Sequence, residues 1–190
     1  MKADMLLTLH AVRLLGFATT GAVADRFQQD PSDVESQLID AGTQGFVAHH
    51  SFAGTAGWSL SEKGRAVNEQ LLREELHRTG GRSTVADVQV MFTALNAVVV
   101  SACSALQMTP HAPAGAALVL RRALDDWIPL EAQLAVVLPR MDGYARRLAH
   151  ALDRQSDPAW ITGTDRDSYH HAWFELHEDL IATLGLRRDT

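Results

Sequence analysis

Histidines and carboxylates gather in the closing segment "YHHAWFELHEDLIATLGL", whose apolar residues recur with a helical period. His170 and His177 are seven residues apart, about 10 Å along a helix, which is too far for one metal ion to bind both. His171 and Glu175 are one turn apart and suit a metal ion, but no clear third ligand accompanies them. Hydrogen-bonded core histidines and helix salt pairs are the favoured interpretation, and no metal site is predicted.

The same segment is rich in aromatic residues that suit a small apolar ligand. His170, Phe174 and His177 share one stripe of the expected helix, which Ile181 and Leu184 continue. A cavity lined by aromatic rings, with a histidine as its polar group, would bind such a ligand. The alternative is an aromatic core and dimer interface. The candidate ligand-binding residues are Tyr144, His170, Trp173, Phe174 and His177.

Catalytic chemistry has little support in the sequence. Cys103 has no cationic neighbour in the chain that would lower the pKa of its thiol. The sequence contains no G-x-S-x-G, phosphate loop, dinucleotide fingerprint or paired-cysteine zinc motif. We therefore expect neither an enzyme nor a cofactor.

Helices that precede a turn-rich stretch are expected in the first part of the chain. The apolar residues up to Phe17 predict a mostly buried first helix. Thr19 or Thr20 is placed to cap a second helix, and Pro31 is placed to open a third. Two short helices joined by a tight turn form a helix-turn-helix. The third helix should bury Val34, Leu38 and Ala41.

Two strands should follow the helix-turn-helix. Residues 46–50 and 58–60 have the composition of strands, and the segment between them can turn a hairpin of medium length. His49 and His50 are neighbours on the first strand and point to opposite faces, so we expect one to pack and the other to meet solvent. Ser61 is placed to cap a further helix. A helix-turn-helix followed by a hairpin and a helix makes a winged helix.

A winged helix places its second helix in the major groove and its hairpin on the backbone or in the minor groove. Ser36 and Gln37 lie on the outward side of that helix, where glutamine most naturally pairs with adenine. Histidines of the hairpin and the basic residues beyond it are candidate phosphate contacts. The candidate DNA-binding residues are Ser32, Ser36, Gln37, His49, His50, Lys63 and Arg65.

Charge argues against tight DNA binding. The net charge is −6, and no Arg or Lys lies between Arg26 and Lys63. Asp33, Glu35 and Asp40 would bring carboxylates toward the phosphates. A winged helix that contacts protein instead of DNA remains the alternative interpretation.

Two stretches resemble a known family. The segment "GWSLSEKGR", after "LIDAGTQGFV", resembles the second wing strand and following helix of MarR- and PadR-like bacterial regulators. With the closing "SYHHAWFELHEDLIATLGLRR", it is similar to a family of small winged-helix proteins from GC-rich Gram-positive bacteria. The resemblance covers most of residues 6–80 and 138–188, and residues 108–130 depart from the pattern. It implies a winged helix with a helical C-terminal domain and, through the label that family carries, a DNA-binding transcriptional regulator.

The second half is expected to be entirely helical. Helices are predicted over 83–108 and 116–138, the latter kinked at Pro129, and a shorter helix is predicted around Tyr144. A loop should occupy 156–168 and lead into the final helix. The fold class is therefore mainly α.

Two domains are expected, a winged helix at 1–80 and a helical dimerisation or ligand domain at 81–190. Residues 88–120 contain no Asp, Glu, Lys or Arg, but prolines and polar residues interrupt this stretch, which disfavours a membrane span. A long uncharged helix usually needs more burial than one small domain offers, so we expect a homodimer. A single cysteine and the absence of a secretory pattern favour the cytoplasm.

Overall fold

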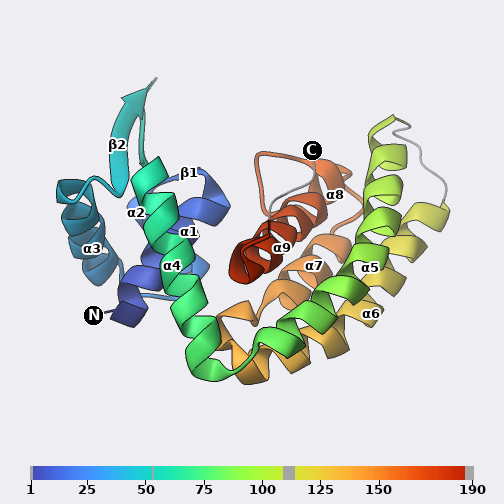
Figure 1. Cartoon of the computed structure of the whole chain (residues 1–190). Coiled ribbons are helices and arrows are strands. Elements are labelled where there is room, and N and C mark those ends of the chain that lie inside the picture. Colours follow the sequence, from blue (N-terminus) through green and yellow to red (C-terminus); the bar gives the residue numbers. More distant parts are fainter. Residues whose placement is uncertain (1, 53, 109–113, 187–190) are drawn as a thin grey trace. The chain divides into compact units, whose positions relative to one another are not determined.

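The computed structural model of the chain describes residues 2–52, 54–108 and 114–186. The fold is mainly helical with a small three-stranded antiparallel sheet, which confirms the expected predominance of helix (Figure 1). The chain divides into two compact units, Met1–Glu75 and Leu76–Thr190, and α4 (Glu62–Thr79) belongs partly to each.

Side-chain caps mark the starts of three helices in the first unit. Thr19, Asp30 and Ser61 each accept a hydrogen bond from a backbone N–H in the first turn of a helix, at 3.2, 2.8 and 2.9 Å. These caps satisfy N–H groups that have no partner within the helix, and they confirm the predicted starts. Before α4, the elements are α1 (Lys2–Leu15), β1 (Phe17–Ala18), α2 (Thr20–Arg26), α3 (Pro31–Thr43), β2 (Val47–Phe52) and β3 (Thr55–Leu60).

The first helix ends earlier than predicted. Gly16 follows α1 with a φ of +72°, which glycine adopts without steric cost. Phe17 then pairs with Ser59 of β3, and its side chain is 45% exposed. The prediction that Phe17 belongs to a buried helix is wrong, because the apolar period does not reveal the break at the glycine.

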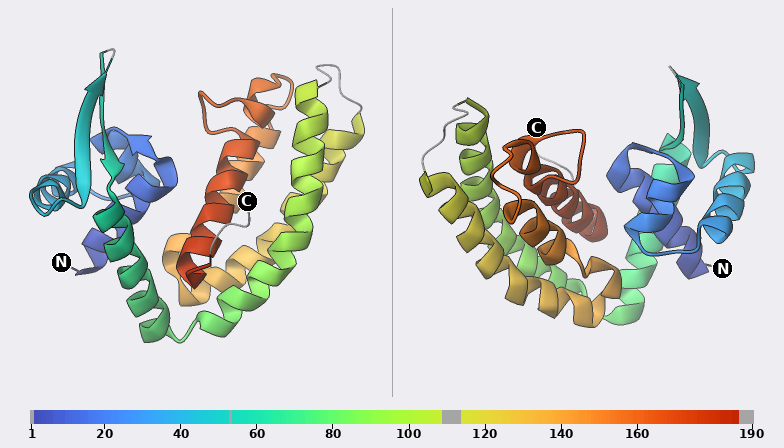
Figure 2. Two further views of the ribbon diagram at one scale, coloured as in Figure 1. Left: turned by 45° about the horizontal axis from the view of Figure 1, so that its top comes forward. Right: turned by 180° about the vertical axis from the view of Figure 1, so that it is seen from behind.

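The sheet has the strand order β1-β3-β2, with β3 antiparallel to both neighbours. Val47 pairs with Leu60 and Phe52 with Thr55, so the strands are longer than the predicted 46–50 and 58–60. In Figure 2, β2 and β3 form a hairpin that extends beyond the helices of its own unit. Gly57, which suggests a turn in the sequence, instead lies in β3 opposite His50, and a side chain there would clash with the Phe17 ring.

The core of the first unit forms where its helices meet the sheet. Trp58 of β3 is anchored to α2 through a 3.1 Å hydrogen bond from its indole N–H to Thr20 Oγ1. The three residues predicted to face inward on α3 are fully buried. The buried cluster consists of Leu9, Ala11, Val12, Ala18, Val23, Ala24, Val34, Leu38, Ala41 and Val47.

The second unit is built from helices. The expected long helices are present, and the second of them continues through Pro129. The loop predicted over 156–168 contains one short helix, and residues 109–113, between the two predicted long helices, lie outside the described residues. The elements are α5 (Arg82–Met108), α6 (Ala114–Val137), a 3-10 turn (Pro139–Met141), α7 (Tyr144–Leu152), α8 (Ala159–Thr162) and α9 (Tyr169–Leu184).

Aromatic rings form the centre of the second unit. Phe92 of α5 stacks on Trp173 of α9 with 4.9 Å between ring centroids, and it meets Trp127 of α6 edge-on at 5.9 Å. All three side chains are at most 2% exposed. Burial of rings this large is a main stabilising contribution to the unit.

The buried face of α9 differs from the predicted stripe through His170, Phe174 and His177. Phe174 is 48% exposed, and both histidines are half-buried. The inward side chains are those of Tyr169, Trp173, Leu176 and Leu180. Ile181 and Leu184, which continue the predicted stripe, are buried as expected. The stripe fails only in the first part of α9, where Tyr169 and Trp173 take the inward positions in place of the adjacent His170 and Phe174.

By length and composition alone, α5 passes the criteria for a membrane-crossing helix. Its most apolar stretch is only 28% buried within the protein. One face packs in the core of the unit, and the other face is exposed.

Candidate functional site

The residues predicted to read DNA bases lie on α3. Ser32 and Ser36 are exposed, whereas Gln37 is half-buried. The Asp30 cap, followed by proline in the first turn, fixes where α3 begins and so which residues face outward.

Each predicted base-reading side chain already makes a hydrogen bond within the unit. The Ser32 hydroxyl donates to the Asp30 carboxylate, and the Ser36 hydroxyl donates to the Ser32 carbonyl at 3.0 Å. Thr8 Oγ1 donates to Gln37 Oε1 at 2.7 Å. A bidentate contact from Gln37 to adenine uses that same oxygen, which has a second lone pair, so the Thr8 bond restricts the orientation of the Gln37 amide without blocking the contact.

The hairpin exposes both of its histidines. The His49 ring lies edge-on to Trp58 with 4.7 Å between centroids, and His50 Nε2 is 3.1 Å from Ser59 Oγ. We expected one histidine to pack and the other to meet solvent, but both are exposed. The strand partner of His49 is Trp58, whose ring contacts the histidine without covering it.

Lys63 and Arg65, the predicted phosphate contacts on α4, differ in their surroundings. Lys63 Nζ donates to the Gln44 carbonyl at 2.8 Å, at the end of α3, and lies 5.2 Å from the centre of the Phe46 ring. A lysine there satisfies a carbonyl that has no partner within the helix. Arg65 is exposed on the same helix.

The outward side of α3 is negative. Asp33, Glu35 and Asp40 are all exposed on it, and the helix contains no Arg or Lys. Arg13, on the scaffold, is not available to DNA because its side chain is 6% exposed and is paired with Glu69 at 3.2 Å. The structure therefore brings few basic groups near the predicted DNA-reading helix.

The predicted ligand-binding residues of the second unit do not share one surface. Tyr144 is 1% exposed and donates to Asp179 Oδ2 at 2.9 Å, and the Trp173 indole donates to Asn96 Oδ1 at 3.0 Å. Phe174 is exposed, and His177 packs against Phe92. Tyr144 and Trp173 thus have the surroundings of core residues with satisfied polar groups.

Two polar clusters of the second unit were not identified from the sequence. Arg140 donates from one guanidinium nitrogen to Asp179 and from another to Thr183 Oγ1 at 2.8 Å, and all three residues are buried. Glu131 is also buried, and its carboxylate accepts from the Trp127 indole and from two backbone N–H groups at the start of α7. Burial nevertheless raises the pKa of Glu131. Trp127 and Glu131 are one helical turn apart, as are Asp179 and Thr183, but Arg140 and the N–H groups of α7 come from other segments, so local spacing could indicate only part of each cluster.

A third polar cluster includes His171 and Glu175, the metal-capable pair of the sequence. His171 Nε2 lies 2.9 Å from the buried carboxylate of Glu175, which raises the pKa of the imidazole. Arg147 pairs with the same carboxylate at 2.8 Å and with Asp167. Among the described residues, no group of three or more His, Cys, Asp or Glu side chains is arranged to bind a metal ion.

Cys103 is buried, and burial raises the pKa of its thiol to about 12. A thiol in this state is a poor nucleophile at neutral pH. Its surroundings in α5 are those of a small core residue.

The chain was compared with protein-family models, with curated proteins and with solved structures, and none of them matches it.

Proposed function

We propose that the first unit is a winged helix that binds duplex DNA, as the DNA-binding part of a transcriptional regulator. The order of its elements supports this proposal: a strand lies between α1 and α2, and a hairpin follows α3. The sheet order β1-β3-β2 puts the short first strand beside the second strand of the hairpin, as in a winged helix. This topology is the single observation that carries the proposal.

In the proposed complex, α3 enters the major groove and the hairpin follows the neighbouring backbone. Ser32 and Ser36 lie toward the start of α3, where the first residues of a recognition helix meet the bases. The segment 41–61, which contains the hairpin, has no acidic residue, so this part of the surface does not repel phosphate. Its histidines and hydroxyl groups would donate to phosphate oxygens.

The small number of basic groups makes the proposed binding weak. Arg26, Lys63 and Arg65 are the Arg and Lys residues of α2 and of the first turn of α4. Because Lys63 already donates to the Gln44 carbonyl, two phosphates neutralised per chain give a slope of about −2 for the logarithm of affinity against the logarithm of salt concentration. The carboxylates of α3 weaken binding further. The protein should therefore bind DNA detectably only at low salt.

Fluorescence anisotropy on a labelled duplex, at salt concentrations from about 20 to 200 mM, tests the proposal. Arg65→Ala should reduce the salt slope by about one unit and weaken binding to all sequences equally. Arg73→Ala is the matched control, because it removes the same charge from an exposed site two turns further along α4. Equal effects of the two variants, or no binding at the lowest salt, would contradict the proposal.

A second candidate function is favoured by the surface of α3. Ile39 is 53% exposed among the acidic side chains, which suits a basic protein partner with an apolar contact better than it suits a phosphate backbone. Under this alternative, the winged helix is a protein-interaction module, and Ile39→Ala abolishes partner binding in a protein that never binds DNA.

A small apolar effector does not enter the proposal, because Tyr144 and Trp173 are packed in the core of the second unit. Binding to chromosomal DNA would require a cytoplasmic protein, so the proposal retains the expected location.

A further inference from the structure

The hairpin of β2 and β3 carries no permanent charge. Residues 47–60 contain no Asp, Glu, Lys or Arg, and His49 and His50 are their only titratable side chains. Histidine is the side chain that ordinarily changes its charge between pH 5 and pH 8. The charge that this hairpin presents to DNA therefore depends on the protonation of two imidazoles.

The hairpin lacks the residue that usually makes a permanent phosphate contact. Arginine is charged at every physiological pH, and its planar fork of donors fits a phosphate group. It is the common basic residue of this chain, but the arginines nearest to the hairpin in the sequence are Arg26 and Arg65. A hairpin whose only cations are histidines responds to pH, whereas one built with arginine does not.

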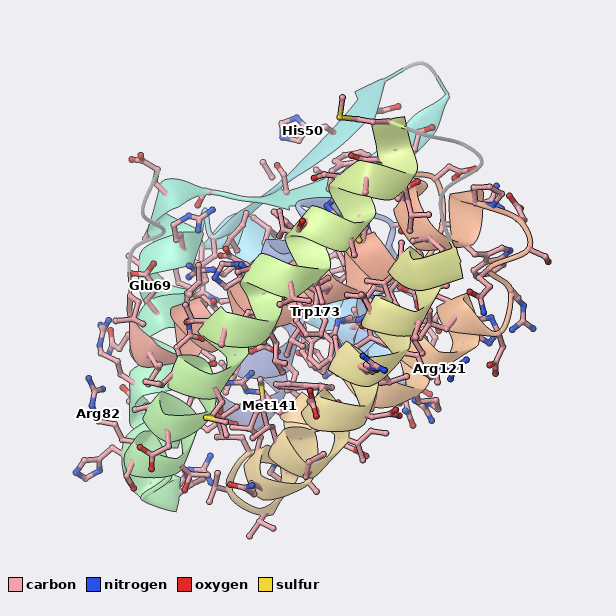
Figure 3. All side chains as sticks on the ribbon, turned by 90° about the vertical axis from the view of Figure 1, so that its right-hand side faces the viewer. His50, Glu69, Arg82, Arg121, Met141 and Trp173 are labelled. Atoms are coloured by element: carbon pink, nitrogen blue, oxygen red, sulfur yellow. The ribbon has the colours of Figure 1, made fainter. Side chains whose placement is uncertain are left out.

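His50 lies on the outer face of the hairpin, beside a hydroxyl group. Its strand partner is Gly57, against which the Phe17 ring packs. Ser59 is on the same face as Gly57, because residues two apart in a strand point the same way. His50 Nε2 is 3.1 Å from Ser59 Oγ in an exposed hydrogen bond, and the His50 ring projects from the hairpin into solvent (Figure 3).

The elements around the two histidines supply no carboxylate partner to them. The side chains of β1 and β3 are uncharged, and His49 lies against Trp58 on the opposite face from His50. Of the helices that pack on the sheet, α1 contributes His10, which is buried, and Arg13, which is paired with Glu69. The ionisable side chains of α3 are the exposed carboxylates of Asp33, Glu35 and Asp40. Within the described part of the chain, neither hairpin histidine forms an ion pair.

Protonation of His50 reverses its hydrogen bond to Ser59. A neutral imidazole with its hydrogen on Nδ1 accepts the Ser59 hydroxyl hydrogen at Nε2. The protonated ring donates from both nitrogens, so Nε2–H is donated to Ser59 Oγ and the hydroxyl hydrogen is released. The pair then presents the Ser59 hydroxyl, His50 Nδ1–H and a positive charge, all of which suit a phosphate oxygen.

We propose that His50 and Ser59 form a phosphate-binding pair that works when His50 is protonated, so that the first unit binds DNA more tightly as the pH falls. The pair belongs to the proposed DNA-binding surface, so this inference rests on the proposed function and adds its regulation. His49 contributes its charge from the other face, within the Debye length of about 20 Å at about 20 mM salt. At pH 8 the hairpin is neutral, and phosphate is neutralised only by the arginines of α2 and α4.

The size of the pH effect follows from the contacts that protonation adds. A hydrogen bond to a charged group contributes at least about tenfold in affinity. Each further phosphate neutralised steepens the salt slope by about one unit. The affinity at about pH 5.5 should therefore be at least about tenfold higher than at pH 8, and the slope should change from about −2 to between about −3 and −4.

Fluorescence anisotropy of the full chain with a labelled random-sequence duplex, at about 20 mM salt and at pH 5.5 and pH 8, tests the proposal. His50→Gln should lose most of the pH effect, because glutamine is polar but binds no proton. His77→Gln is the matched control, because His77 is exposed on α4, outside the hairpin, and this variant should keep the full effect. Wild-type binding that is equal at the two pH values, or equal effects of the two variants, would overturn this inference alone. Absence of binding at both pH values would overturn the proposed DNA binding with it.

Two further variants separate the charge of His50 from its shape. His50→Arg should bind at pH 8 about as tightly as the wild type binds at pH 5.5, because arginine holds the charge permanently. Ser59→Ala should weaken binding at pH 5.5 and leave it unchanged at pH 8, because the hydroxyl becomes a free donor only after protonation. If His50→Arg binds weakly at both pH values, or if Ser59→Ala acts equally at both, the pair is not the pH-dependent group.

Discussion

Removal of the Asp179 carboxylate should destabilise the second unit strongly. The Asp179 side chain is completely buried, and it is bound by the Arg140 guanidinium and by the Tyr144 hydroxyl. The Arg140 side chain is 3% exposed, so Asp179→Ala would leave a positive charge in the core without its carboxylate partner. Breaking a buried pair in this way costs about 3–5 kcal/mol.

For a unit of this size, that loss corresponds to a decrease in melting temperature of about 10–20 °C. Thermal unfolding followed by circular dichroism at pH 7 measures it. Asp153→Ala is the matched control, because Asp153 also pairs with an arginine, Arg121, but its side chain is 66% exposed. The control should change stability by less than about 1 kcal/mol.

A double variant separates the charge from the packing. Replacement of both members, as in Arg140→Met with Asp179→Leu, removes the unpaired charge and should recover most of the stability lost in Asp179→Ala. If Asp179→Ala costs no more than Asp153→Ala, water reaches Arg140 in the folded protein. In that case, the assignment of this pair to the buried core is wrong.

Two further changes test the packing of α4 and the ionisation of α9. Gly64→Ala should lower the free energy of unfolding in urea by about 1–3 kcal/mol, because the added methyl group would overlap the Phe46 carbonyl. Gly21→Ala is the control and should be near neutral, because its methyl group would make only an ordinary contact. Glu175 raises the pKa of His171 above the ordinary value of 6.5, so this pair stabilises the fold fully below pH 6.5, and the stabilisation is lost as pH rises through the raised pKa. Thermal melts should show this loss in the wild type and a flatter dependence in His171→Gln, and equal slopes for the two proteins would refute the assignment.

The parts of the fold that the sequence predicted well are those controlled by local chemistry. Caps at Thr19, Asp30 and Ser61 and the proline of α3 act within one turn of the residues they order, so the helix starts could be predicted. The inward face of α3 was also correct, because Val34, Leu38 and Ala41 share one side of the helix at a spacing of four and three residues, whereas Ile39 lies off that side and is exposed.

The parts that were missed depend on contacts between distant segments. Phe17 leaves its expected helix to pair with Ser59, and Gly57 lies in a strand beneath the Phe17 ring, where no side chain would fit. On α9, Trp173 and Phe174 are neighbours of similar hydrophobicity, and only the packing of Trp173 on Phe92 determines which one faces inward. The ligand-binding prediction was weakened for the same reason.

The candidate DNA site depends on which groups remain accessible after folding. The sequence correctly indicated that α3 is poor in cations, but it could not show that Glu69 holds Arg13 or that the Gln44 carbonyl holds Lys63. Both interactions form across distances of nineteen residues or more in the chain. They reduce the basic surface below what the composition suggests.

The most direct test of the central claim is an NMR titration of the ¹⁵N-labelled protein with a short duplex at low salt. The proposed winged helix predicts that amide signals of α3 near Ser32 and Ser36, and of the hairpin near His49 and His50, change together, while those of α9 stay in place. Shifts confined to other surfaces, or no shifts at a tenfold excess of duplex, would contradict the claim that this unit binds DNA.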